Sequence, residues 1–431
     1  MELRYFFTSK RFLFLVIFTL LFSVRFYLLY QANKSGSYTQ KEIISGGDGA
    51  DYLRIGRNIA KFHVYGDHNA DYPTENATWR VPVWPFVLSI VFLFSENMLF
   101  IIVAKCLLET VLLFYIFYLF QQRSKLKAVE LWPFLIIFLE PQYLKYSITY
   151  LSESFTALLI LLLVVLFVFY ERAKSYQITI PIVAALVVLC HPVASLFVLM
   201  LFGFYLLYNL RFGFAQPFLY GMLFLLIVLS WPTRNYLTFN KGFFMTASQG
   251  TTFSKGWNEK VATNFTNVDG DMADENMNLK YIGLKTLPRA DSDILNESKL
   301  YSEGTWKFIE SISLSEKVKI AWVKIKSNFN PLPEKPKKGI LENLGTLFRI
   351  AYALLFLSLI LRLFRGKIKP DSIKDRIYLV LISIVTGQIF ISVYIYTGLR
   401  FNSIYGLALL FCLLYLSKDF FSGLKRKIYH S

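Results

Sequence analysis

The feature that most limits the fold of this chain is a series of long apolar runs separated by short basic clusters. Runs of this length are typical of helices that cross a bilayer. Ten crossings are predicted, at residues 12–30, 98–120, 129–147, 153–170, 177–190, 193–210, 216–232, 342–364, 377–397 and 401–416. Hydrophobic residues make up 55% of the 431, which excludes an ordinary soluble protein. We therefore expect an all-α polytopic membrane protein.

The net charge of +17 follows from basic residues that gather in the short loops between these runs. All the basic clusters fall on one side of the membrane if the N-terminus is cytoplasmic, as the positive-inside rule requires. The charge is therefore explained by topology, and no nucleic-acid partner is expected. The clusters are Arg4/Lys10/Arg11, Arg123/Lys125/Lys127, Arg172/Lys174, Arg211, residues 362–376 and Lys425/Arg426/Lys427.

The short apolar run at residues 82–94 decides the topology. It contains two prolines, and a crossing here would turn most of the later basic clusters outward. We therefore expect a juxtamembrane helix on the outer face. The predicted organisation is a first transmembrane helix (1–30), an outer loop (31–97), six transmembrane helices (98–232), an outer segment (233–341), three transmembrane helices (342–416) and a basic cytoplasmic tail (417–431).

The first outer loop contains the stretch SGGDGADYLRIGRNIAKF, from Ser45 to Phe62. From Tyr52 onward, apolar and basic residues each recur at helical spacing, which predicts an amphipathic helix with a cationic face at the bilayer surface. Asp51 stands where such a helix would be capped, so a capping role competes with a role in binding. Asp48 lies among glycines that allow the backbone to approach a ligand closely.

Two further acidic residues lie in or beside predicted crossings. Glu153, in YLSESF, is at the outer end of one crossing, where a carboxylate is costly unless it is solvated, paired or used. It either caps a helix after Ser152 or contributes to a site. Glu140 and Lys145 lie near the end of the third crossing, and we expect that they pair with each other.

Basic residues on the expected outer face oppose the charge bias of the chain, so each one invites an explanation. Arginine binds phosphate oxygens through two parallel hydrogen bonds, whereas a single basic residue also reaches lipid head groups without any special function. Several of them facing two acids favour one shared site. The residues are Arg80, His191, Arg234, Lys255 and Arg400.

Another interfacial helix is predicted at residues 315–329, where apolar side chains share one face with lysines beside it. The chain contains no P-loop, dinucleotide fingerprint, HExxH or GxSxG motif. Energy for a reaction would therefore have to come from the substrate itself.

The ordered set of motifs resembles the polytopic glycosyltransferases of the C superfamily, especially bacterial relatives of protein O-mannosyltransferases and of the lipid A aminoarabinose transferase. The matching stretches are GGDGADYLRIGRNIA, RVPVWPFVLSI, EPQYLKYSITYLSES, SWPTRNY and GLRFN. They span most of the chain in the family order. One departure is Asp48-Gly49, where the first motif of the family often has two adjacent acids.

The resemblance implies an inverting transfer of a sugar from a polyprenyl-phosphate donor to a glycan, lipid or protein acceptor at the outer face of a bacterial inner membrane. Asp48 matches the catalytic Asp of the family and would act as general base. Glu153 would orient the acceptor or share a divalent cation with Asp48, although two oxygen ligands do not define a metal site. Substrate-binding residues would be Asp51, Tyr52, Arg80, His191, Arg234, Lys255 and Arg400, with Arg234 and Arg400 neutralising the departing phosphate.

Two other interpretations remain open. An O-antigen-type polysaccharide polymerase or ligase is also aromatic-rich and polytopic, with arginines in large outer loops. A carrier or flippase for lipid-linked sugars would place its functional polar residues deep in the membrane, and Glu140 and Lys145 are the feature that favours it.

Overall fold

The computed structural model describes residues 10–34, 47–66, 77–124, 132–170, 174–264, 275–287, 294–329, 340–364, 366, 368, 371–395 and 402–429. Every regular element in these ranges is a helix, as the sequence predicts. The bundle contains α2 (Lys10–Lys34), α6 (Met98–Ser124), α9 (Glu153–Val168), α10 (Lys174–Cys190), η2 (Pro192–Ala194), α11 (Ser195–Leu210), α12 (Ala215–Phe239), α17 (Ile340–Phe364), α18 (Ile373–Tyr394) and α20 (Gly406–Tyr429).

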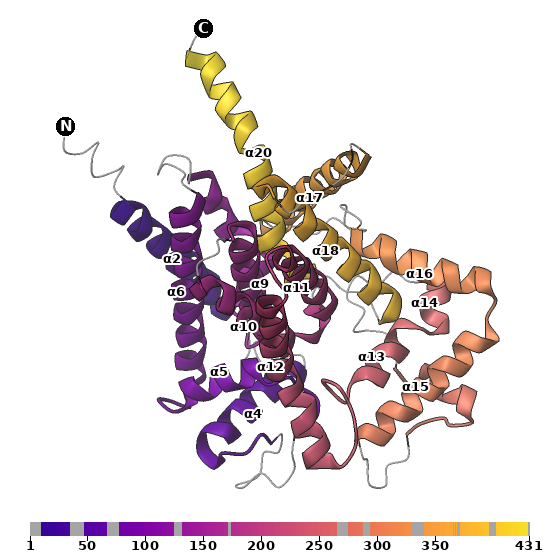
Figure 1. Cartoon of the computed structure of the whole chain (residues 1–431). Coiled ribbons are helices and arrows are strands. Elements are labelled where there is room, and N and C mark those ends of the chain that lie inside the picture. The colour runs from indigo at the N-terminus through magenta and orange to yellow at the C-terminus, as the bar shows by residue number, and fades with distance from the viewer. Residues whose placement is uncertain are drawn as a thin grey trace.

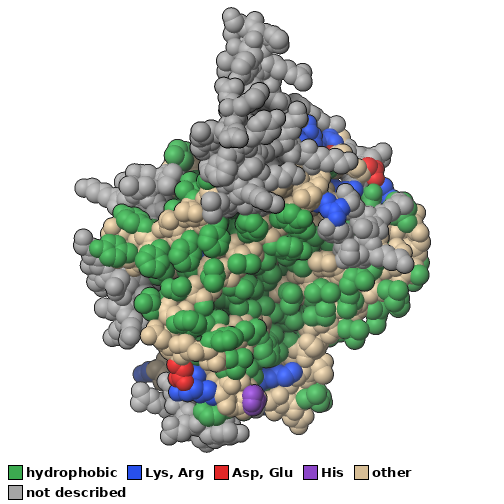
Figure 2. All heavy atoms as spheres, turned by 90° about the vertical axis from the view of Figure 1, so that its left-hand side faces the viewer, with side chains coloured by type: hydrophobic (Ala, Val, Ile, Leu, Met, Phe, Trp, Pro, Cys, Tyr) green, Lys and Arg blue, Asp and Glu red, His purple; other side chains and the backbone are tan. Residues whose placement is uncertain are grey.

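Five segments of the described part are long and apolar enough to cross a membrane: Met98–Ser124, Pro192–Leu210, Ala215–Phe239, Gly345–Phe364 and Ile373–Tyr394. Shorter apolar helices include α9 and residues 177–190 and 406–418. Figure 2 shows a broad hydrophobic surface on one side of the molecule, with charged side chains gathered near its edges. The described part of the chain is therefore helical with five candidate membrane-spanning segments, whereas the predicted total of ten crossings is not confirmed.

The predicted crossing at 129–147 is not one continuous helix. It is divided into η1 (Trp132–Leu139), a 3-10 helix, and α8 (Pro141–Ser147), which meet at Glu140. Proline has no N–H to donate and disfavours helical geometry in the preceding residue, so a break before Pro141 is expected. The Glu140 carboxylate accepts a hydrogen bond from the Tyr143 N–H at 2.6 Å and caps α8. The expected pair with Lys145 is wrong, because the Lys145 ammonium lies over the Tyr146 ring instead.

The segment predicted as the first outer loop, a name kept below, forms two packed helices, α4 (Gly47–Phe62) and α5 (Val83–Phe92). They lie together at one end of the bundle, opposite the C-terminal end of α20 (Figure 1). Gly56 permits their close approach, because a Cβ there would lie 2.9 Å from the Leu88 Cβ. The helix begins earlier than the sequence suggested, with Asp48 already in its first turn. Asp51 is therefore inside the helix, and the capping interpretation of Asp51 is wrong.

The outer segment contains α13 (Gln249–Gly256), α14 (Glu259–Asn264), η4 (Glu275–Ile282), α15 (Ile294–Ser311) and α16 (Leu314–Phe329). These helices have a small core of their own, made by Phe253, Trp257, Val261, Phe308 and Ile320. The helix predicted at 315–329 corresponds to α16. It exposes Leu314, Val318 and Trp322, which lie four residues apart on one face.

Lys324 is the least expected residue of α16, because its side chain is fully buried. Its ammonium lies 4.6 Å from the centre of the Trp257 ring and donates to the Val393 carbonyl at 3.1 Å. Burial holds the pKa of Lys324 well below its usual value of 10.5. This lysine joins the outer segment to the end of α18 and destabilises the folded state when it is charged.

Lys324→Met is expected to stabilise the protein by about 1–3 kcal/mol at pH 7. The Val393 carbonyl keeps a partner, because the Trp257 indole N–H donates to it at 2.8 Å. Since the folded-state pKa is lowered, the unfolded state binds more protons, and wild-type stability rises with pH up to the unfolded pKa. The stabilisation of the Lys324→Met variant relative to the wild type should therefore decrease as the pH approaches about 10.4, the pKa of lysine in the unfolded chain.

Thermal unfolding across this pH range, in detergent, measures the effect. Lys326→Met, an exposed lysine on the same helix, is the matched control and should change little. Equal gains from both substitutions at every pH would contradict the role given to burial.

Candidate active site

Arg80 joins the two aspartates of the first outer loop. One of its nitrogens, Nη2, pairs with Asp48 Oδ1 and lies 2.6 Å from Asp51 Oδ2. Arg54, one turn along α4, approaches the other oxygen of Asp51 at 2.5 Å. Burial alone lowers the pKa of Arg80, but the negative charges of Asp48 and Asp51, with Tyr52, outweigh it and raise the pKa above its usual value. Arg80 is therefore a permanent cation that holds two carboxylates together.

Helical spacing explains this arrangement. Asp48 and Asp51 are three residues apart, so they lie on the same side of α4. Arg80 comes from the segment just before α5, which packs along α4. The Asp48 side chain is 28% exposed, whereas those of Asp51 and Arg80 are each 15% exposed. Asp48 is thus the member of the trio that solvent and ligands reach most readily.

Tyr52 connects this trio to the bundle. Its ring lies 5.5 Å from the Arg80 guanidinium carbon, and its hydroxyl oxygen is 3.2 Å from Ser152 Oγ at the start of α9. Burial raises the pKa of the Tyr52 hydroxyl, while the Arg80 charge opposes that change. Trp84 of α5 strengthens the same junction by donating to the Tyr150 carbonyl at 2.8 Å. The outer loop is therefore fixed against the outer end of α9.

Glu153 and His191 lie on the bundle side of this junction. The Glu153 side chain is fully buried in the first turn of α9, and its Oε1 is 3.8 Å from His191 Nε2. Its charge contributes to the raised pKa of Tyr52, as does that of Asp48. The simple capping role is not what the structure shows, because Ser152 is the N-cap and Glu153 points into the protein.

Arg234 reaches the first outer loop from α12. It donates to the carbonyls of Ala77 and Tyr65 at 3.1 and 3.4 Å. The rings of Tyr65 and Trp231 lie 5.1 and 4.9 Å from its guanidinium carbon. These contacts hold the loop segments at Tyr65 and Ala77 against α12. Arg234 therefore positions the loop that carries Arg80. Its proposed contact with phosphate stays a prediction.

One predicted residue, Lys255, is not brought to this junction. Lys255 lies on α13 in the outer segment, where its ammonium is 3.7 Å from the Glu275 carboxylate. Arg400 lies outside the described residues. The candidate site therefore consists of Asp48, Asp51, Tyr52 and Arg80, with Glu153 and His191 behind Tyr52.

A buried cluster of charged side chains, which was not predicted, lies beside this site. Glu109 of α6 lies 3.0 Å from the Lys105 ammonium and 3.5 Å from the Arg25 guanidinium of α2. Ser154, next to Glu153, donates to Glu109 at 2.6 Å and accepts from Lys105 at 2.8 Å. The sequence contains an indication of this cluster. Lys105 and Glu109 are four residues apart within an apolar run, so they share one face of a helix where unpaired charges are costly.

The described residues contain no group of three or more His, Cys, Asp or Glu side chains suited to hold a metal ion. No protein-family model, curated protein or solved structure matches the chain.

Proposed function

We propose that the chain is an inverting glycosyltransferase that moves a sugar from a polyprenyl-phosphate donor to an acceptor at the outer face of a bacterial inner membrane. The observation that carries the proposal is the Asp48–Arg80–Asp51 trio. It lies beside Tyr52 and Glu153 where the first outer loop meets the helical bundle. The ordered motifs of the sequence support the same activity.

In the proposed reaction, an acceptor hydroxyl attacks the anomeric carbon of the donor sugar. A new C–O bond forms as the bond from that carbon to the phosphate oxygen breaks, and its electron pair leaves with the polyprenyl phosphate. Asp48 takes the proton of the hydroxyl as the new bond forms. Attack opposite the leaving phosphate inverts the configuration, and no cofactor is consumed.

The other residues of the site position the reacting groups. Arg80 keeps the Asp48 carboxylate charged and oriented, so that little reorganisation is needed when the hydroxyl arrives. Glu153 and His191 are placed to orient the acceptor through the junction at Tyr52 and Ser152. A lipid-phosphate donor suits a site at the border of a membrane bundle, because its tail stays in the lipid while its sugar reaches the outer loop.

The buried cluster of Arg25, Lys105 and Glu109 does not favour the carrier alternative. Their side chains are 0–1% exposed and form ion pairs with one another within the bundle, although Arg25 Nε and Glu109 Oε2 have no hydrogen-bond partner among the described residues. A carrier needs its deep polar residues to line a path for the substrate. Tight burial instead assigns this cluster to holding α2, α6 and the start of α9 together.

The test uses the purified full-length protein in lipid, a panel of radiolabelled polyprenyl-phosphate sugars, and a bacterial envelope extract that supplies glycan, lipid and protein acceptors. Release of polyprenyl phosphate is followed for the wild type and for Asp48→Asn, which preserves size and removes the base. We expect release with at least one donor, and a rate at least about 100-fold lower for Asp48→Asn.

Asp371→Asn is the matched control. Asp371 pairs with Arg211 at 2.9 Å on an exposed surface away from the outer loop, so this variant should retain the wild-type rate. A well-folded Asp48→Asn protein with full activity would rule out the role of Asp48 as base. Absence of release from every donor would overturn the proposed reaction.

A further inference from the structure

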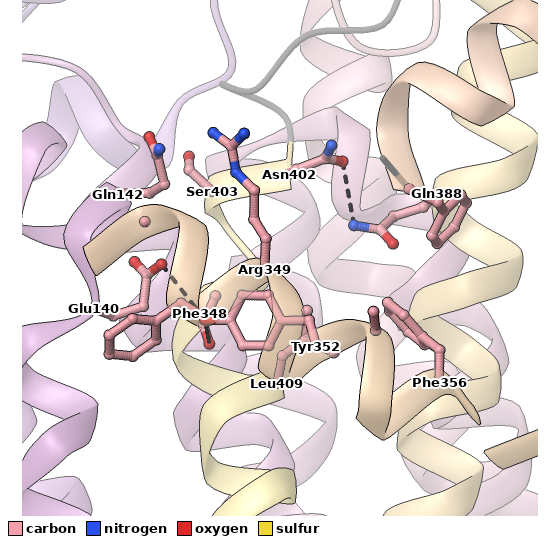
Figure 3. A pocket seen from close by; sticks show the side chains of 14 residues that line it. Glu140, Gln142, Phe348, Arg349, Tyr352, Phe356, Gln388, Asn402, Ser403 and Leu409 are labelled. Carbon is pink, nitrogen blue, oxygen red and sulfur yellow. Dashed lines mark hydrogen bonds between the residues drawn. The ribbon is translucent and has the colours of Figure 1, made fainter. Parts of the chain in front are cut away.

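A second feature of the bundle is a pocket between α17, α18, α20 and the junction of η1 with α8. It contains about 740 Å³ of space, part of which is open to solvent. None of its lining residues belongs to the Asp48 site, and the mechanism proposed above does not use it. In Figure 3 the Arg349 guanidinium, Gln142, Asn402 and Ser403 lie toward one end of the pocket, whereas the labelled aromatic rings lie toward the other end, together with Glu140.

The polar end is built around Arg349 of α17. Its guanidinium points toward the end of the pocket where Gln142, Asn402 and Ser403 lie (Figure 3). Within the described part of the chain, Arg349 makes no hydrogen bond or ion pair, although its charge and that of Glu140 attract each other across the pocket. The buried Oε1 of Gln142 likewise has no hydrogen-bond partner among the described residues. A half-buried arginine with unused donors is suited to receive an anionic group.

Glu140 is the acidic residue among the described residues that line the pocket, and its carboxylate is oriented by other groups. Glu140 accepts the Tyr143 N–H at 2.6 Å, and the Tyr352 hydroxyl lies 3.5 Å from its Oε1. It stands at the N-terminus of α8, where the backbone N–H groups favour a carboxylate. In Figure 3, Glu140 lies beside Tyr352, whereas the Arg349 guanidinium points away from that side. An anion beside Arg349 therefore does not have to displace Glu140.

The opposite end of the pocket is lined mainly by aromatic rings. Phe348, Tyr352 and Phe356 recur every four residues on the side of α17 that faces the pocket. Phe329 of α16 adds another ring, 5.5 Å from that of Phe356. Elsewhere on α17, Leu354 is 60% exposed, as expected for a helix that contacts lipid. The pocket thus joins a cationic end to an aromatic wall on a membrane-spanning helix.

We propose that this pocket binds a phosphate-headed lipid, with the phosphate on Arg349 and the start of the hydrocarbon chain against Phe348, Tyr352 and Phe356. Arginine presents a planar pair of N–H groups that matches two phosphate oxygens. The amides of Gln142 and Asn402 are close enough to the pocket to contact ester or sugar oxygens on the phosphate. A free phosphate ion would use only the polar end and leave the aromatic wall unfilled.

The test measures binding directly, so it does not depend on the proposed transferase activity. The full chain in detergent is titrated with radiolabelled polyprenyl phosphate and, separately, with phosphatidylglycerol, while inorganic phosphate serves as a competitor. We expect saturable binding of at least one lipid, about tenfold or more weaker for Arg349→Gln and largely retained by Arg349→Lys. Tighter binding of polyprenyl phosphate would identify the donor lipid as the occupant, and tighter binding of phosphatidylglycerol would identify a membrane lipid.

Arg362→Gln is the matched control, because Arg362 lies on the same helix and pairs with Asp375 at 2.8 Å at the other end. It should bind both lipids like the wild type. Thermal unfolding of each variant shows that the protein is folded. Wild-type binding of both lipids by folded Arg349→Gln would overturn the proposal, as would inorganic phosphate that competes as well as either lipid does.

Discussion

Glu109→Leu is expected to lower the free energy of unfolding by about 3–5 kcal/mol, because it leaves two buried cations without their shared carboxylate. The side chains of Arg25, Lys105 and Glu109 are each at most 1% exposed, so water does not replace the lost partner. Lys105 also donates to the Tyr146 and Ser147 carbonyls at the C-terminal end of α8, and to Ser154 Oγ in the first turn of α9. The loss should therefore extend to the outer end of α9.

Chemical or thermal unfolding in detergent measures this loss. Glu96→Leu is the control, because Glu96 pairs with Arg57 and Lys61 on the surface at 47% exposure, where an ion pair contributes at most about 1 kcal/mol. A second variant, Glu109→Gln, keeps a hydrogen-bond acceptor for Ser154 and removes only the charge. If Glu109→Leu were no more destabilising than Glu96→Leu, the cluster would not hold the helices together.

Arg80→Gln is expected to lower kcat/KM for sugar transfer by about 100-fold, since the Asp48 carboxylate loses the group that orients it. The pH dependence should change as well. Without the cation, Asp48 and Asp51 face each other as like charges, which raises the pKa of one of the carboxyl groups. Because the proposed base must be deprotonated, activity should then fall at a higher pH than in the wild type as the solution is acidified.

Arg54→Gln separates this effect from a general loss of positive charge. Arg54 contacts Asp51 at 2.5 Å, whereas Arg80 contacts both aspartates. We expect a smaller loss and a smaller change in the pH profile for Arg54→Gln, and partial recovery of both for Arg80→Lys. Identical pH profiles for the wild type and Arg80→Gln would show that Arg80 does not set the charge of the reacting carboxylate.

The helical spacing of the first outer loop was readable in the sequence, but the start of its helix was not. The pattern from Tyr52 onward predicted an amphipathic helix, and α4 confirms it. The same pattern predicts Asp51 as the N-cap, because the glycines before it favour a loop. In the structure the helix includes Gly47 and Gly49, since packing against α5 outweighs the low helical propensity of glycine.

The third predicted crossing, at residues 129–147, was expected to be one long helix, whereas the structure has two short ones there. This predominantly apolar run is long enough for a crossing, yet Pro141 divides it. Proline is tolerated where neighbouring groups satisfy the freed backbone, and Glu140 does so at the start of α8. The break also explains the failure of the expected pair with Lys145. Hydropathy alone does not distinguish a continuous helix from two short ones.

Composition and periodicity by themselves determined that this chain is helical and has membrane-spanning segments, because a bilayer requires apolar runs whose backbone is satisfied within helices. The residue pattern also singled out Asp48 and Arg80 as candidates, and the family resemblance added Tyr52. Only the tertiary structure decided that Arg80 bridges Asp48 and Asp51, that Arg234 holds the loop, and that Lys324 is buried. Such pairings join residues far apart in the chain, and the packing of helices, rather than local spacing, sets which side chains meet.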